Sequence, residues 1–180
     1  MEAALKESFL REQLFGLSFQ GMAQRGHLYR AEADAARKEA WRRRIFERLR
    51  AIDTAVVASM ADAHYIAWLC GLHDEVGGWQ ETAAVMKNGR WRVGSAQKLV
   101  NLWLKYLWCH GTQAPPPPHF PVDGVILNHI PSMRHIRWTE LDDWNGYRGI
   151  IAEARALAGT EPLALWELRR WQSPSRSLKA

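Results

Sequence analysis

Apolar residues recur every three or four positions over most of the chain, and this periodicity predicts a protein built almost entirely of α-helices. Residues 2–20 carry a short apolar stripe. The segment from about 27 to 52 carries a longer stripe that includes Trp41, Ile45 and Leu49. The fold class expected from this pattern is all-α, a compact helical bundle.

Capping residues and glycines set the expected limits of the later helices. Asp53 is expected to begin a helix that Gly71 ends, and Thr139 is expected to begin one that Gly159 ends. A last helix is expected at 160–171. We therefore treat residues 1–172 as a single helical domain and residues 173–180 as a frayed C-terminal tail.

Two segments have more than one interpretation. Residues 79–87 fit a helix that Asn88-Gly89 ends, whereas the same dipeptide is typical of a type I′ turn, which would join 83–87 and 90–94 as a hairpin. We favour a helix followed by a tight basic turn. Residues 120–127, which follow four consecutive prolines, are either a short strand or a loop that enters a helix.

The segment 96–109 is apolar on nearly all sides, so it is the predicted central buried helix, with Ser95 as its N-cap. Its polar residues Lys98, Asn101 and Lys105 lie at i, i+3 and i+7 and form one stripe. Burial and the positive end of the helix dipole both disfavour a charged lysine in the first turn. Lys98 is therefore expected to have a lowered pKa and to be a candidate nucleophile.

The overall composition is that of an ordinary globular protein, with 47% apolar and 24% charged residues in a chain of 180. No apolar run is long enough to span a membrane, and the first residues do not form a secretory signal, so we expect a cytoplasmic protein, with a monomer favoured. Cys70-x-x-His73 and Cys109-His110 match no strong zinc spacing. Neither a metal nor a cofactor is therefore expected.

The net charge of +5, with a pI near 9.5, is typical of a protein with a polyanionic partner. Arg90 and Arg92 lie just before the central helix. The basic face between Arg37 and Arg50 could hold phosphates, or it is an ordinary exposed helix face with ion pairs such as Glu39–Arg43.

The run Val93-Gly94-Ser-Ala-Gln-Lys98, then a buried helix, then Phe120-Pro-Val-Asp123, resembles the core signature of the helix-hairpin-helix DNA glycosylases. The resemblance covers residues 88–127. The usual Leu-Pro-Gly-Val-Gly hairpin is Gly-Arg-Trp-Arg-Val-Gly here, two extra residues separate the glycine from the lysine, and the four prolines lengthen the gap to the aspartate. Two cysteines cannot hold the four-cysteine iron–sulfur cluster of some members.

The resemblance implies a function and a set of site residues. Lys98 matches the catalytic lysine of the bifunctional members, Asp123 matches the catalytic aspartate, and Gly94 matches the last hairpin glycine, which lies on the DNA backbone. The implied activity is excision of a damaged or modified base that is flipped out of DNA. In this interpretation Trp91, Trp103 or Trp108 stacks on the base, and Asn101 or Gln97 reads its edge or orients Asp123. The expected DNA contacts are Arg90, Arg92, Gly94, Lys105, Arg43 and Arg44.

Simpler interpretations exist for the same residues. Asp123-Gly124 is a standard turn dipeptide, and Lys98 fits a solvated lysine at a helix start. His119, His129 and His135 flank the aspartate and are candidate acid–base groups. The alternative function is a non-catalytic module that binds nucleic acid or a protein through its basic helix and exposed aromatic residues.

Overall fold

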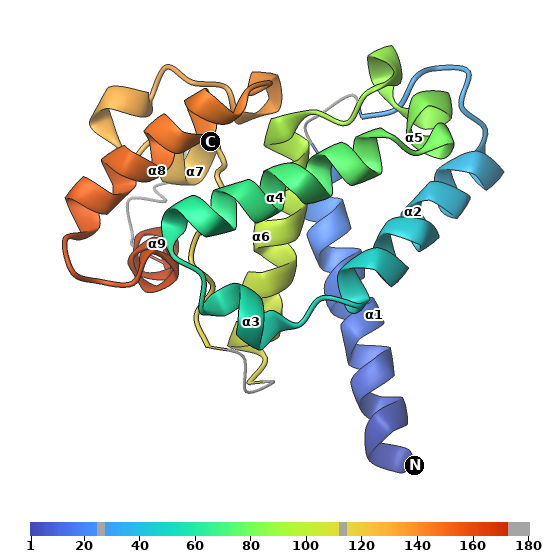
Figure 1. The fold of residues 1–180 in the computed structure, drawn as a ribbon, viewed down its shortest axis with the longest axis horizontal. Coiled ribbons are helices and arrows are strands. Elements are labelled where there is room, and N and C mark those ends of the chain that lie inside the picture. The colour runs from blue at the N-terminus through green and yellow to red at the C-terminus, as the bar shows by residue number, and fades with distance from the viewer. Residues whose placement is uncertain (25–27, 112–114, 173–180) are drawn as a thin grey trace, which may run out of the picture.

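Helix α6 (Val93–Cys109) runs through the centre of the molecule, and the other helices pack around it (Figure 1). It is buried continuously from Val93 to Lys105 and again at Leu107, which confirms the predicted central helix. Helix α1 (Glu2–Ala23) lies alongside it, and α4 (Asp62–Gly77) crosses it (Figure 1). The apolar surface of α6 is therefore covered from several directions, as expected for a helix that is apolar nearly all round.

The computed structural model describes residues 1–24, 28–111 and 115–172. Within these ranges the chain is all-helical, as predicted, and its only β-type pairing is an isolated bridge between Tyr29 and Met86. The predicted tail, 173–180, lies outside the described residues. No helix in the described part is both long and apolar enough to cross a membrane. The remaining elements are α2 (Ala35–Arg50), α3 (Thr54–Ala58), α5 (Gln80–Val85), η1 (Lys87–Gly89), α7 (Gly124–Leu127), η2 (Pro131–Met133), η3 (Trp138–Glu140), α8 (Trp144–Ala158) and α9 (Leu163–Gln172).

Helix α2 buries the predicted apolar stripe, but it begins later than expected. Trp41, Ile45 and Leu49 are at most 1% exposed. The helix starts after Asp34, whose side chain accepts a hydrogen bond from the backbone N–H of Arg37. The preceding residues run alongside the end of α5, where Arg30 N–H donates to the carbonyl of Val85. The expected start at residue 27, which is not among the described residues, is therefore wrong.

Several helix boundaries in the structure differ from the predicted ones. The helix expected at 53–70 is two helices, α3 and α4. Asp53 caps the first as predicted, but Gly71 lies inside the second instead of ending it. Helix α8 begins after its cap Asp143 and not at Thr139, which belongs to the 3₁₀ turn η3. Gly159, with φ of 60°, ends α8 as expected.

The favoured interpretation of 79–94, a helix followed by a tight turn, is confirmed. Helix α5 ends at Val85, and Asn88 and Gly89 both have positive φ angles, 59° and 68°. The turn geometry of the rejected hairpin is therefore present, but no strand flanks it in the described residues. Residues 120–127 are a loop that enters α7, one of the two alternatives.

Helix α6 starts three residues earlier than predicted. The helix begins at Val93, with Arg92 at the N-cap position, whereas Ser95 is inside it. The N–H of Gly94 donates to the carbonyl of Leu141 at 2.8 Å. The segment after η3 therefore satisfies a backbone donor of the first turn that a capping side chain would otherwise satisfy.

Candidate functional site

The fold brings Lys98 and Asp123 together. The Nζ atom of Lys98 lies 3.6 Å from Oδ2 of Asp123, and the two side chains are 10% and 20% exposed. Lys98 comes from the first turns of α6, and Asp123 is the residue before α7. A cation and a carboxylate with little access to water interact more strongly than an ordinary surface pair.

The two carboxylate oxygens of Asp123 interact with different partners. Oδ1 accepts hydrogen bonds from the backbone N–H groups of Val125 and Ile126, at 2.9 and 3.2 Å, and so caps α7. Oδ2 faces Lys98. The capping role that the sequence allowed for Asp123 is therefore present, and it fixes the carboxylate in the orientation that faces the lysine.

Trp138 completes the surroundings of the lysine. Its ring centroid lies 4.1 Å from Nζ of Lys98, and the residue is 4% exposed. An ammonium group over an aromatic face gains electrostatic stabilisation from the ring. Sequence reasoning missed Trp138, because it lies in a 3₁₀ turn where no helical periodicity marks its position.

Gly94 has a packing role rather than the predicted contact with DNA. It is buried, and its N–H is already bonded to Leu141. A Cβ atom at this position would lie 1.9 Å from the carbonyl oxygen of Trp138. Glycine is required at position 94 because the backbone of η3 approaches α6 this closely. The backbone N–H of Gly94 is buried and already bonded, so it cannot reach a phosphate.

Gln97 and Asn101 are both 0% exposed, and their amide groups bond to each other and to the protein interior. The Nε2 atom of Gln97 donates to the carbonyls of Gly94 and Val122, and Asn101 bonds to Tyr65 and Tyr147. Neither side chain has a hydrogen-bonding group free to read a base edge in this structure. That predicted role is replaced by an internal one.

Trp91 and Trp103 lie in the core, at 2% and 0% exposed. Trp91 packs edge-on against Trp41, and Trp103 packs edge-on against Phe15. The prediction that either ring stacks on a base therefore does not fit the structure, because no open face remains. Trp108 is half-buried near the end of α6.

Lys105, predicted to contact DNA, forms a buried ion pair with Glu167 of α9. Its Nζ atom lies 2.8 and 2.7 Å from the two carboxylate oxygens, and the side chains are 8% and 1% exposed. Burial raises the pKa of Glu167, and the positive charge of Lys105 opposes this rise. The lysine is committed to Glu167 and has no access to a phosphate.

Three of the four arginines predicted to contact DNA have partners within the protein. Arg92 donates to the carbonyl of Thr139 at 3.0 Å, and Arg90 pairs with Asp142. Arg44 pairs with Glu81 and lies over the ring of Trp79, whereas Arg43 is exposed.

The basic face of α2 carries several ion pairs, as the simpler interpretation of the sequence expected, although Glu39 pairs with Arg42 and not with Arg43. Besides Arg44–Glu81, the ion pairs of α2 are Arg37–Asp34, Arg42–Glu39, Arg48–Glu75 and Arg50–Glu47.

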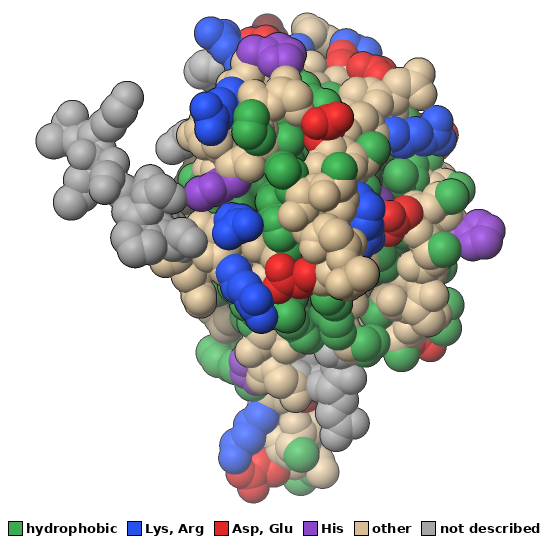
Figure 2. All heavy atoms as spheres, turned by 90° about the vertical axis from the view of Figure 1, so that its left-hand side faces the viewer, with side chains coloured by type: hydrophobic (Ala, Val, Ile, Leu, Met, Phe, Trp, Pro, Cys, Tyr) green, Lys and Arg blue, Asp and Glu red, His purple; other side chains and the backbone are tan. Residues whose placement is uncertain are grey.

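The side of the molecule that carries α7, α8 and α9 is shown in Figure 2. On this side, basic and His side chains are interspersed with acidic and apolar ones.

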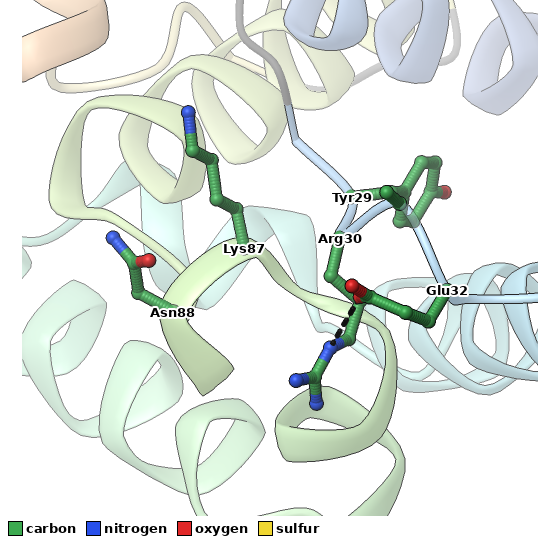
Figure 3. A pocket seen from close by; sticks show the side chains of 6 residues that line it. Tyr29, Arg30, Glu32, Lys87 and Asn88 are labelled. Atoms are coloured by element: carbon green, nitrogen blue, oxygen red, sulfur yellow. Dashed lines mark hydrogen bonds and ion pairs between the residues drawn. The ribbon is translucent and has the colours of Figure 1, made fainter.

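Two surface pockets have the size of a small ligand. The larger, about 670 Å³, is lined by residues 29–32 together with Lys87 and Asn88. Its side chains diverge, and Arg30 is paired with Glu32 (Figure 3). The smaller, about 320 Å³, begins at Gly124 and Val125, directly after Asp123, and extends to Arg134. Only the second is adjacent in sequence to the Lys98–Asp123 pair.

His119 is completely buried next to Asp62 and Tyr147. Its Nε2 lies 3.4 Å from Oδ1 of Asp62, and its Nδ1 lies 3.0 Å from the hydroxyl of Tyr147. Burial lowers the pKa of His119. The close approach of His119 and the two hydrogen bonds from Arg155, at 3.2 and 2.9 Å, lower the pKa of Asp62 to about 2, although burial opposes this.

The described residues include no group of three or more His, Cys, Asp and Glu side chains that could hold a metal ion. Comparison with protein-family models, with curated proteins and with solved structures found no match.

Proposed function

We propose that this protein is a DNA glycosylase that excises a flipped-out damaged or modified base, with Lys98 as nucleophile and Asp123 as its acidic partner. The observation that carries the proposal is the 3.6 Å approach of Nζ to Oδ2 at a site with little solvent access. The sequence signature that resembles the helix-hairpin-helix glycosylases supports the same pair independently of the geometry.

The proposed reaction begins when Asp123 accepts a proton from Lys98 and leaves a neutral amine. The amine attacks C1′ of the flipped nucleotide. The bond between C1′ and the base breaks, and the base leaves with the bonding electrons and takes up a proton. That proton is the one Asp123 received from Lys98, so Asp123 is a carboxylate again and stabilises the positive charge that develops on the sugar. The ring oxygen then takes up the proton that the attacking nitrogen loses, and the opened sugar is a Schiff base with Lys98. Loss of a C2′ proton to Asp123 and departure of the 3′ phosphate from C3′ cleave the strand, and water hydrolyses the Schiff base to release Lys98.

We place the extruded nucleotide in the smaller pocket, whose lining begins at Gly124, the residue after Asp123. Its lining includes backbone and apolar side chains of α7 together with the polar Asn128 and Arg134. Arg134 donates to the carbonyl of Asn128 at 3.0 Å, and this bond fixes the guanidinium at the edge of the pocket. A cation in this position suits the phosphate of the extruded nucleotide.

Borohydride trapping tests the proposal directly. Duplexes that carry different modified bases are incubated with the protein and reduced, and a stable protein–DNA adduct is expected. Lys98→Ala is expected to abolish the adduct, whereas Lys87→Ala, which removes an exposed lysine of the other pocket, is expected to retain it. Base release is measured in parallel, because a glycosylase that uses water as nucleophile does not form an adduct. Absence of both adduct and base release across the panel contradicts the proposal.

A second candidate, a non-catalytic module that binds a protein, is favoured by one observation. Leu5, Phe9 and Leu17 of α1 are 66%, 60% and 52% exposed, and the N-terminal part of this helix extends away from the other helices (Figure 1). Exposed apolar side chains on one helix are typical of interaction surfaces. The trapping experiment separates the two candidates, because a binding module gives neither adduct nor base release.

A further inference from the structure

We propose that Gln97 is a positioning residue that holds Asp123 opposite Lys98, an assignment that rests on the proposed function. Gln97 does not touch the reacting atoms. It acts through the backbone of Val122, the residue before Asp123.

The contact between Gln97 and Val122 is a two-bond clamp. The N–H of Val122 donates to Oε1 of Gln97 at 3.0 Å, and Nε2 of Gln97 donates to the carbonyl of Val122 at 2.9 Å. Two bonds to the same residue fix both the position and the rotation of its backbone. Gln97 and Lys98 are consecutive in α6, and Val122 and Asp123 are consecutive in the facing loop. The clamp and the ion pair are therefore in register, and the clamp fixes the direction in which Asp123 leaves the backbone.

The hydrogen-bond partners around position 97 require a glutamine side chain. Besides the clamp, Nε2 donates to the carbonyl of Gly94 at 2.9 Å, and Oε1 accepts from Nδ2 of Asn101 at 3.3 Å. Both donors and both acceptors of the amide are thus used in a site that is 0% exposed. Glutamate has no donor for the two carbonyls, and methionine has neither donors nor strong acceptors.

The orientation of the Gln97 amide is set by a buried chain of polar groups behind it. Asn101 Nδ2 donates to the hydroxyl of Tyr147 at 3.1 Å, and the hydroxyl of Tyr65 donates to Oδ1 of Asn101 at 2.6 Å. His119 lies on the far side of Tyr147. Because Oδ1 of Asn101 accepts from Tyr65, its Nδ2 is directed at Tyr147 and at Oε1 of Gln97. If the Gln97 amide were reversed, its Nε2 would face Nδ2 of Asn101, and two donors would lie against each other.

The first experiment measures the position of Asp123 without any reaction. In Gln97→Met, the exchange of the Val125 and Ile126 amide protons, which Asp123 caps, is expected to accelerate at least about tenfold relative to the unmodified protein. Thr82→Val is the matched control. Thr82 is also 0% exposed and also makes two buried hydrogen bonds, to Trp41 and Val76, but it belongs to α5, which lies on the opposite side of the molecule from α7 (Figure 1). Equal exchange in the two variants overturns the assignment.

The second experiment separates positioning from general destabilisation. Gln97→Met is expected to slow single-turnover base release about 100-fold, the order expected for misplaced reacting groups, with a DNA Kd unchanged within about threefold. Thr82→Val is expected to keep both values. If the two variants lose rate equally, or if Gln97→Met retains its rate, the assignment is wrong. If the unmodified protein releases no base, the proposed function fails, and the exchange experiment still decides whether Gln97 holds Asp123.

Gln97→Glu supplies a second variant that conserves size. Its carboxylate faces the carbonyls of Gly94 and Val122, and protonation restores one donor to this pair. Relative to the unmodified protein at each pH, base release by Gln97→Glu is therefore expected to recover as the pH falls from 8 to about 5, because a buried carboxyl among carbonyls takes up a proton readily. If the rate of base release by Gln97→Glu, divided by that of the unmodified protein, does not change with pH, the result contradicts the clamp.

Discussion

Gly94 and Trp138 are so close that the carbonyl oxygen of Trp138 occupies the space of a side chain at position 94. A Cβ atom there would lie 1.9 Å from this oxygen and 3.3 Å from Cβ of Leu141. The approach places η3 against the first turn of α6 and brings the Trp138 ring beneath the ammonium group of Lys98. The glycine of the sequence signature therefore shapes the site through packing.

Gly94→Ala is expected to destabilise the fold by about 1–3 kcal/mol or more, because the backbone of η3 must move to admit a methyl group. The free energy of unfolding in urea measures this change. Gly71→Ala is the control, because nothing lies within 4 Å of a Cβ atom at that position of α4. It is expected to stabilise the protein by about 0.5–1 kcal/mol, through the higher helix propensity of alanine. Equal effects of the two substitutions would show that the contact with Trp138 is relaxed in solution.

Asp123→Asn separates the capping role of Asp123 from its proposed chemical role. Asparagine is as good an N-cap as aspartate, so the hydrogen bonds from the N–H groups of Val125 and Ile126 are expected to persist. Base release is expected to fall at least about 100-fold, because the amide cannot accept the proton of Lys98. Asp53→Asn is the matched control, since Asp53 caps α3 through two backbone N–H groups in the same way. Retained activity in Asp123→Asn contradicts the assigned role.

Much of the fold could be predicted from the sequence, because α2 and α6 present apolar faces that mark their position. The first and last residues of the helices were harder to predict. Ser95 is a good capping residue, yet the chain starts α6 earlier because Leu141, 47 positions away, accepts the hydrogen bond of Gly94. Gly71 is a typical helix stop, but the packing of α4 extends the helix past it. Both differences arise from contacts between distant segments, which local propensity does not contain.

The residues of the candidate site could be predicted only where a sequence motif marked them. The signature pointed to Lys98 and Asp123, and the structure places them 3.6 Å apart. Glu167 was missed, although one signal was present: it lies on the apolar face of α9, where an acid needs a buried cation as partner. Lys105 on the apolar α6 carried the matching signal. The two residues are 62 positions apart, and their pairing requires knowledge of how α9 packs against α6.

Removal of one member of the Lys105–Glu167 pair is expected to cost more than removal of both. Lys105→Met leaves a buried carboxylate without its cation, and a loss of about 3–5 kcal/mol in the free energy of unfolding is expected. Lys105→Met combined with Glu167→Leu is expected to recover most of that loss. For the DNA complex that the proposed function requires, the salt dependence of the affinity provides an independent check, because loss of a phosphate contact would reduce its slope by about one. We expect an unchanged slope in Lys105→Met.

The buried histidine gives the stability a specific dependence on pH. Burial lowers the pKa of His119 in the folded protein, with Asp62 opposing this effect and Arg155 adding to it. Below the pKa of about 6.5 expected for an unfolded histidine, the unfolded chain binds a proton that the folded chain does not. The free energy of unfolding therefore falls as the pH drops from 7 toward 5, by at most about 1.4 kcal/mol per pH unit for this one group.

The variant His119→Gln isolates this contribution from other titrating groups. The lowered pKa of Asp62, about 2 against an ordinary 3.8, makes its stabilising effect disappear only in more acidic solution, below about pH 4. The raised pKa of Glu167 acts with the opposite sign, because stability then falls as the pH rises above the ordinary carboxyl value. Asp62 titrates below the pH range of this experiment, and the pKa shift of Glu167 does not depend on His119, so neither carboxyl accounts for a difference between the two proteins at pH 5–7. Urea unfolding at pH 7, 6 and 5 is expected to show a steeper loss for the unmodified protein than for His119→Gln. Parallel losses would mean that His119 takes up its proton equally well in the folded and unfolded chains.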